Sequence, residues 1–139
     1  MCIRDRADIP KHVTLNSEGI EYNRRVIHDQ EVYAANWMAK YVPQDEKIFT
    51  DCKGFNVLHG LGKIPEPRIN NYLISYYDDK EHEINGIIYL DYYPVNSGKI
   101  IVRYPVEGIK EREVDIDKYR YIFIERAKIY ANNGSEIYK

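Results

Sequence analysis

The succession of a helix, a short strand and a second helix between residues 28 and 62 constrains the fold more than any other feature of the sequence. The segment HDQEVYAANWMAKYVP predicts a helix with Asp29 as its N-cap and Pro43 as its stop. Apolar side chains recur there at helical spacing, at Ala34, Trp37, Met38 and Tyr41. Trp37, the only tryptophan, is expected on the side of this helix that faces the core.

KIFT, at residues 47–50, predicts a short strand that ends at Asp51. The next segment, DCKGFNVLHGLG, predicts a loop that leads into a brief helix ended by Gly60 and Gly62. A strand placed between two helices is typical of a parallel α/β unit.

After residue 69 the pattern is mainly β. Four strand candidates are separated by polar loops: NYLISYY, GIIYLDYY, KIIVRY and YRYIFIE. KIIVRY is the most one-sided of them and is expected at the periphery. The terminal KIYANNGSEIYK predicts a β-hairpin whose turn contains Asn132, Asn133 and Gly134. We therefore expect an α/β fold: a small mixed sheet with a long N-terminal helix, one short helix and a C-terminal β-hairpin.

The first six residues, MCIRDR, differ in character from the rest of the chain. Met-Cys-Ile-Arg-Asp can be encoded by a string that looks like a transposon end-sequence used to tag DNA for sequencing. We therefore expect residues 1–6 to be a sequencing or cloning scar, residues 7–28 to be an extended lead-in, and residues 29–139 to form a single α/β domain. A genuine basic N-terminus is the alternative.

Composition excludes several classes of protein. A net charge of −2 provides no broad basic field, so no nucleic-acid partner is expected. The longest apolar runs span four or five residues, far below the ~20 that a membrane helix needs. If Cys2 belongs to the scar, Cys52 is alone and no intrachain disulfide is expected.

The sequence carries no recognisable catalytic or cofactor-binding motif. The four histidines are scattered at positions 12, 28, 59 and 82 without the spacing of paired metal ligands, so neither a metal nor a cofactor is expected. The acidic run DDKEHE at 78–83 lacks the glycine-turned order of a calcium loop and is typical of a loop between strands.

A candidate ligand site comes directly after the KIFT strand, since open α/β sheets bind ligands where strands end. Its residues are Asp51, Lys53, Gly54 and His59. Asp51 is suited to bind a hydroxyl-rich ligand or to act as a base. The competing interpretation, which we favour, is that Asp51 caps the next helix and needs no ligand.

The fourteen tyrosines have two interpretations. AT-rich codons and strand packing explain many of them. A carbohydrate- or protein-binding surface is the alternative, and it requires several exposed rings aligned on one face.

Four segments occur in an order that resembles the C-terminal region of an archaeal family of multi-spanning membrane proteins of unknown function, similar to membrane glycosyltransferases that use lipid-linked sugars. They are PKHVTLNS, DQEVYAANWMAKYV, KIFTDCKGFNVLHGLG and KIYANNGSEIYK. The positions that match the family pattern are Glu31, Ala34, Ala35, Trp37, Asp51, Gly54, Ile129, Tyr130, Asn133, Gly134, Ile137 and Tyr138. Asn133 and Cys52 depart from it, standing where a glycine and an aromatic residue are expected.

The resemblance implies a soluble, extracytoplasmic domain that comes after a transmembrane region. In such glycosyltransferases the catalytic acids lie in the membrane portion, so no catalytic residue is transferred to this chain. Its expected partners are its own transmembrane region and a glycan or polymer acceptor. Two alternatives stay open: a small free-standing α/β enzyme that uses Asp51 and His59, or a carbohydrate- or protein-binding module.

Overall fold

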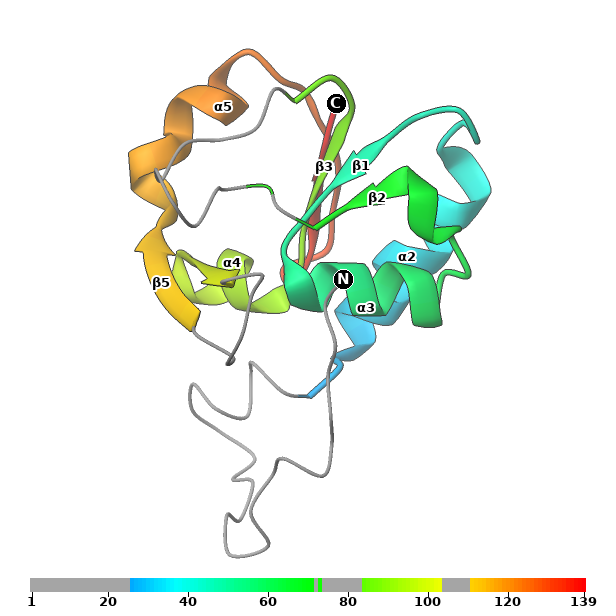
Figure 1. The fold of residues 1–139 in the computed structure, drawn as a ribbon, viewed down its shortest axis with the longest axis horizontal. Helices are drawn as coiled ribbons and strands as arrows, with labels where there is room; N and C mark the ends of the chain where they lie inside the picture. Colours follow the sequence, from blue (N-terminus) through cyan, green and yellow to red (C-terminus); the bar gives the residue numbers. More distant parts are fainter. Residues whose placement is uncertain (1–25, 72, 74–83, 104–110) are drawn as a thin grey trace, which may run out of the picture.

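The structure is a computed structural model, and it describes residues 26–71, 73, 84–103 and 111–139 (Figure 1). The expected scar, nearly all of the expected lead-in and the acidic run 78–83 lie outside these residues. The described elements are α2 (Asp29–Tyr41), β1 (Ile48–Phe49), α3 (Cys52–Gly60), the 3-10 helix η2 (Glu66–Arg68), β2 (Ile69–Asn70), β3 (Ile87–Leu90), α4 (Tyr92–Ser97), β4 (Lys99–Arg103), β5 (Glu111–Asp115), the 3-10 helix η3 (Ile116–Tyr119), α5 (Arg120–Ile124), β6 (Lys128–Ala131) and β7 (Glu136–Tyr138).

A five-stranded mixed sheet in the order β2-β1-β3-β7-β6 forms the centre of the fold. Strands β2, β1 and β3 are parallel, β7 is antiparallel to β3, and β6 is antiparallel to β7. The expected parallel α/β unit and the expected C-terminal hairpin are therefore confirmed. Asn133 has φ 68°, the left-handed conformation that its short polar side chain tolerates in a tight turn.

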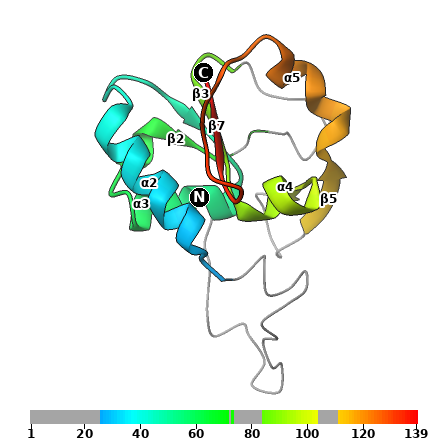
Figure 2. The same cartoon turned by 180° about the vertical axis from the view of Figure 1, so that it is seen from behind.

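The two faces of the sheet are covered by different elements (Figure 1 and Figure 2). Helices α2 and α3 lie on one face, and the β4-β5 hairpin with α5 lies on the other. Side chains alternate between these faces along β3, because successive residues of a strand point to opposite sides. Ile87 and Tyr89 pack toward the helices, whereas Ile88 and Leu90 pack toward the hairpin.

The sheet thus separates two cores. The helix-side core contains Ala34, Ala35, Met38, Val42, Ile48, Phe55, Val57, Leu58, Ile64, Ile69, Ile87, Tyr89 and Ile137. The hairpin-side core contains Phe49, Leu73, Ile88, Leu90, Ile100, Val102, Val114 and Tyr119.

The N-terminal helix differs from its prediction in two respects. It spans 13 residues, and His28 rather than Asp29 is its N-cap, with the His28 backbone N–H donating to Glu31 Oε1 at 3.1 Å. Its buried side is formed by Glu31, Ala34, Ala35 and Met38, so Tyr41 is exposed and Trp37 is only partly buried. The apolar spacing predicted the helix correctly. It placed Trp37 and Tyr41 on the core-facing side, whereas that side is centred on the alanines and Met38.

Two segments predicted as strands contain helices instead. GIIYLDYY forms a strand only as far as Leu90, and α4 then begins after Asp91 and ends at Gly98, whose φ of 73° suits a helix end. The strand prediction for YRYIFIE is wrong, because this segment contains α5. The place beside β3 is taken by β7, and α5 instead packs Ile122 and Phe123 against the hairpin-side core.

The remaining strand predictions had mixed outcomes. KIIVRY forms β4, and its place in a separate two-stranded sheet confirms the peripheral position. Its partner β5 lies in a segment predicted as a loop; Val114 pairs with Ile100 and is buried, while polar residues fill most of the strand. Most of NYLISYY lies outside the described residues, and β2 precedes it. The four α-helices of the described residues correct the expectation of one long and one short helix.

Candidate functional site

Two aspartates lie after adjacent parallel strands at the same edge of the sheet. Asp51 comes two residues after β1, Asp91 comes directly after β3, and the two strands are paired in parallel. Open α/β sheets bind ligands at this carboxyl edge. Together with three neighbours, these residues form a set of buried polar side chains that we name the carboxyl-edge cluster: Glu31, Thr50, Asp51, Lys53 and Asp91.

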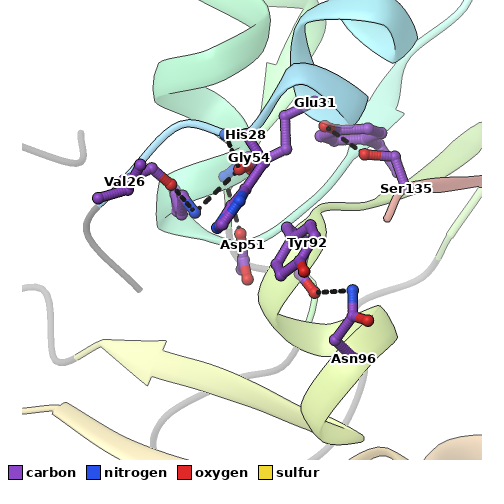
Figure 3. Close-up of polar contacts among 10 residues, drawn as sticks. Val26, His28, Glu31, Asp51, Gly54, Tyr92, Asn96 and Ser135 are labelled. Carbon is purple, nitrogen blue, oxygen red and sulfur yellow. Dashed lines mark hydrogen bonds and ion pairs between the residues drawn. The ribbon is translucent and has the colours of Figure 1, made fainter. Parts of the chain in front are cut away.

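Asp51 begins helix α3. Its Oδ1 accepts a hydrogen bond from the Gly54 backbone N–H at 2.8 Å, which satisfies one of the free donors at the start of the helix (Figure 3). A Cβ atom at position 54 would collide with the Thr50 hydroxyl, so the close approach of β1 and α3 requires glycine here. The preferred interpretation of Asp51 as a helix cap is confirmed.

Lys53 forms a buried ion pair with Glu31, which α2 contributes. Lys53 Nζ lies 3.0 Å from Glu31 Oε1, and the two side chains are 8% and 0% exposed. Lys53 Nζ also donates to the Val26 carbonyl oxygen at 2.8 Å, and Glu31 Oε1 accepts the His28 backbone N–H (Figure 3). The pair therefore joins α2, α3 and the segment before α2. Such a pair must offset the cost of removing two charges from water.

The buried carboxyl groups of Asp51 and Asp91 influence each other's pKa. Burial raises the pKa of Asp91 well above its usual range, and the negative charges of Asp51 and Glu31 raise it further. Burial also raises the pKa of Asp51, but the neighbouring Asp91 carboxyl and the Gly54 backbone N–H oppose this shift. Because burial and the neighbouring Asp51 charge both favour the neutral form of Asp91, we infer that Asp91 rather than Asp51 is the protonated member of the pair. Within the described residues, neither Asp91 carboxyl oxygen has a hydrogen-bond partner.

Aromatic groups surround the cluster. Burial raises the pKa of Tyr89 well above its usual range, with the charges of Asp91 and Glu31 adding to this effect, and its hydroxyl lies 3.4 Å from Ser135 Oγ. The His28 ring stacks on Tyr92 with ring centroids 3.6 Å apart. Burial and then the Lys53 charge lower the pKa of His28, which favours the neutral imidazole.

The arrangement combines a proton donor, a carboxylate and an ammonium group, which are the components of acid–base chemistry. Every member of the cluster is nevertheless buried. The hydrogen bonds and the ion pair of Asp51, Lys53 and Glu31 are made within the cluster or to nearby backbone. Among the described residues, no group of three or more His, Cys, Asp or Glu side chains is arranged to hold a metal ion.

The structure brings together three of the four predicted site residues. Asp51, Lys53 and Gly54 lie at the first turn of α3. His59 lies at the opposite end of that nine-residue helix, is exposed, and its Nδ1 lies 3.0 Å from the Ile64 carbonyl oxygen. The proposed pairing of Asp51 with His59 therefore has no support in the geometry.

Sequence reasoning missed the two acids that complete the cluster, Glu31 and Asp91. For Asp91 a signal existed, because IIYLD repeats the pattern of IFTD, a buried strand with an aspartate at its end. Glu31 was named only as a position that matches the family pattern. Its position three residues before Ala34 on the buried side was the available signal.

Cys52 corrects another expectation. It is disulfide-bonded in the structure, so the prediction that it has no intrachain partner is wrong. The only other cysteine of the sequence, Cys2, lies outside the described residues.

Fold and site together define a class: a small mixed α/β domain with a buried polar cluster at the carboxyl edge of its parallel strands. The sequence matches the family described as predicted membrane protein (DUF2206) over residues 3–138 of 139. The chain therefore belongs to the DUF2206 family of predicted membrane proteins, whose function is unknown. Among curated proteins and solved structures, none matches it. Within the described residues, no helix combines the length and the apolar character needed to cross a membrane.

Proposed function

We propose that this chain is the extracytoplasmic, C-terminal domain of a glycosyltransferase-like membrane protein, and that it contributes no catalytic residue to that protein. Membership of a predicted membrane protein family supports the first part of the proposal. The resemblance to membrane glycosyltransferases, whose catalytic acids lie in the membrane portion, supports the second. On this proposal the domain contacts its own transmembrane region and positions an acceptor.

Burial of the carboxyl-edge cluster carries the non-catalytic part of the proposal. The groups best suited to acid–base chemistry are at most 9% exposed; Asp51 caps α3, and the Glu31–Lys53 pair joins α2 to α3. A catalytic acid must come within hydrogen-bond reach of its substrate. Buried as they are, Asp51 and Asp91 are better placed to hold the domain together than to meet a substrate.

The location is tested by cysteine labelling of the full-length protein in intact cells. With all native cysteines of the full-length protein replaced by serine, Glu125→Cys introduces a thiol at an exposed position, and Met38→Cys introduces one at a position that is 1% exposed. A membrane-impermeant maleimide is expected to label the first variant without lysis and the second only after denaturation. Labelling of Glu125→Cys only after lysis would place the domain in the cytoplasm and refute the proposed location.

The absence of a catalytic role is tested by Asp51→Asn and Asp91→Asn in the same full-length protein. Each change preserves the shape of the side chain, and an amide oxygen can still accept the Gly54 N–H. Transfer of sugar from a lipid-linked donor in membranes is expected to stay within about threefold of wild type when activity is normalised to folded protein. A loss of roughly a hundredfold or more at equal abundance would assign catalysis to the cluster.

That last outcome would favour the second candidate, an α/β enzyme in its own right. One observation favours it: Asp51 and Asp91, whose pKa values are both raised by burial, follow adjacent parallel strands at the edge where such sheets bind ligands. This version uses Asp91 in place of His59 as the partner of Asp51. It requires the cluster to become accessible to a substrate.

A further inference from the structure

An aromatic surface runs along α2 on the side away from the carboxyl-edge cluster. Tyr33, Trp37 and Tyr41 are spaced four residues apart, so they lie along one side of the helix over about 12 Å. Tyr33 and Tyr41 are 61% and 58% exposed, and Trp37 is partly buried between them. With Tyr130 of β6, these residues form what we name the aromatic strip.

A β-bulge in the edge strand places Tyr130 in this strip. Lys128 pairs with Tyr138 and Tyr130 pairs with Ile137, so Ile129 is the extra residue and is 37% exposed. As a result Tyr130 lies on the helix side of the sheet, with its ring centroid 4.9 Å from that of Trp37. Trp37 also contacts the Tyr41 ring, with centroids 5.3 Å apart. Trp37 is thus held by ring contacts from two elements, Tyr41 of α2 and Tyr130 of β6.

We propose that the aromatic strip binds a neutral oligosaccharide. A pyranose ring has a face of C–H groups and an edge of hydroxyls, and it suits an aromatic ring that is apolar in its body and polar at its tip. The exposed Asn36 and Lys40 lie between and beside the rings, where their side chains can meet sugar hydroxyls. Three aromatic residues in a line match an extended chain of sugars.

Area argues against a protein partner. Tyr33 and Tyr41 together expose on the order of 250 Å². A stable protein–protein interface buries about 800 Å² on each partner, several times this amount. The strip is large enough for a few sugar rings, whereas a protein would need additional surface.

Charge argues against a lipid surface. Membrane-surface helices present lysine and arginine around a broad aliphatic face. In the sequence around the strip, Lys40 and Lys47 are balanced by the exposed Asp45 and the half-buried Glu46, and α2 begins with Asp29. The exposed large side chains of the strip are tyrosines rather than leucine or isoleucine. An uncharged ligand with many hydroxyls is therefore the better fit.

This inference deepens the proposed function by naming the acceptor class, but its test does not depend on where the domain lies. Trp37 is the only tryptophan, so its fluorescence reports directly on the strip. Cellohexaose and maltohexaose are titrated separately into the 139-residue chain. At least one of them is expected to change the Trp37 emission saturably, and Tyr33→Ala and Tyr41→Ala are each expected to weaken that binding at least about fivefold.

Tyr121→Ala is the matched control, because Tyr121 is 54% exposed but lies on α5, which covers the other face of the sheet. It is expected to leave the binding constant unchanged. The absence of a saturable change with either sugar, or an equal loss in Tyr121→Ala, overturns the proposal.

Vesicles of phosphatidylcholine and phosphatidylglycerol separate a sugar site from a membrane site. They are expected to leave the Trp37 emission unchanged. A response to vesicles that Tyr33→Ala and Tyr41→Ala abolish would assign the strip to the membrane instead. None of these results would alter the outcome of the labelling experiment on Glu125→Cys.

Discussion

On the hairpin side of the sheet the buried side chains are hydrocarbon or aromatic, whereas the helix-side core adjoins a cluster of buried carboxylic acids and a lysine. The first arrangement gains stability with each apolar group removed from water, at about 25 cal/mol for each Å². The second must first offset the desolvation of its charges, and it succeeds only while every partner is present. On the hairpin side, a substitution should therefore lower the free energy of unfolding in proportion to the apolar area it removes. In the carboxyl-edge cluster, removal of a single charged partner should cause a disproportionately large loss.

Removing the buried cation tests this difference most severely. Lys53→Met keeps most of the apolar stem but leaves the Glu31 carboxylate, which is fully buried, without its counter-charge. We expect a loss of about 3–5 kcal/mol in the free energy of unfolding, measured by urea denaturation of the 139-residue chain. The double variant Lys53→Met/Glu31→Gln should recover much of this loss. A double variant no more stable than Lys53→Met would mean that the unpaired charge of Glu31 does not cause the loss of stability.

The corresponding test on the hairpin side is a substitution that creates a cavity. Ile100 is 2% exposed and packs in the hairpin-side core, so Ile100→Ala should cost about 2–5 kcal/mol through lost burial and the cavity that remains. Because Ile100 carries no charge, the loss should be the same at pH 5 and pH 8. Ile124→Ala, at a position 77% exposed, should stay within about 0.5 kcal/mol of wild type. A loss that changes with pH would show that the two faces are coupled.

The close approach of β1 and α3 gives a smaller effect with a control in the same helix. In Gly54→Ala the new methyl group meets the buried Thr50 side chain, and we expect a loss of about 1–3 kcal/mol. In Gly60→Ala the methyl group meets nothing within 4 Å, so it should stabilise the helix by up to about 1 kcal/mol. Thermal unfolding of the two variants gives the comparison directly. Shifts of equal sign would remove the steric explanation for Gly54.

Local signals determined how much of the fold was predictable. The helix before KIFT, the β1 strand, the cap by Asp51 and the C-terminal hairpin each carry their own signal in consecutive residues. YRYIFIE carries an equally clear β signal and is helical, because β7 occupies the place beside β3. No pattern within those seven residues contains that information.

The candidate site shows the same limit. Asp51, Lys53 and Gly54 are neighbours in sequence and were identified together. Glu31 and Asp91 come from elements 20 and 40 residues away from Asp51, and only the parallel pairing of β1 with β3 and the packing of α2 bring them to it. His59 was chosen for its closeness in sequence, and the length of α3 separates it from Asp51. A search for a second strand with an aspartate at its end would have found Asp91.

The raised pKa of Asp91 gives the last and smallest effect, a change in how stability depends on pH. The pKa of Asp91 is raised in the folded protein, so the folded chain keeps a proton that the unfolded chain loses above about pH 4. The stabilisation from this proton is complete at lower pH and is lost as pH rises toward the folded pKa. The amide of Asp91→Asn keeps the shape of the side chain and has no proton to lose in this pH range. Above pH 4 its free energy of unfolding should therefore fall less steeply than that of wild type, by at most ~1.4 kcal/mol per pH unit.

Urea denaturation at pH 4, 5, 6, 7 and 8 measures the two slopes. The lowered pKa of His28 has the opposite effect, since it makes stability rise with pH up to about 6.5, but His28 is present in both proteins and cancels in the difference. Asp117→Asn is the control, because that side chain is 77% exposed and pairs with Arg120 at the surface. Its slope should match that of wild type. If Asp91→Asn also matches wild type, Asp91 titrates alike in the folded and unfolded chains. The folded chain would then not retain a proton on Asp91, and the difference between the carboxyl-edge cluster and the hairpin side would rest on the Glu31–Lys53 ion pair alone.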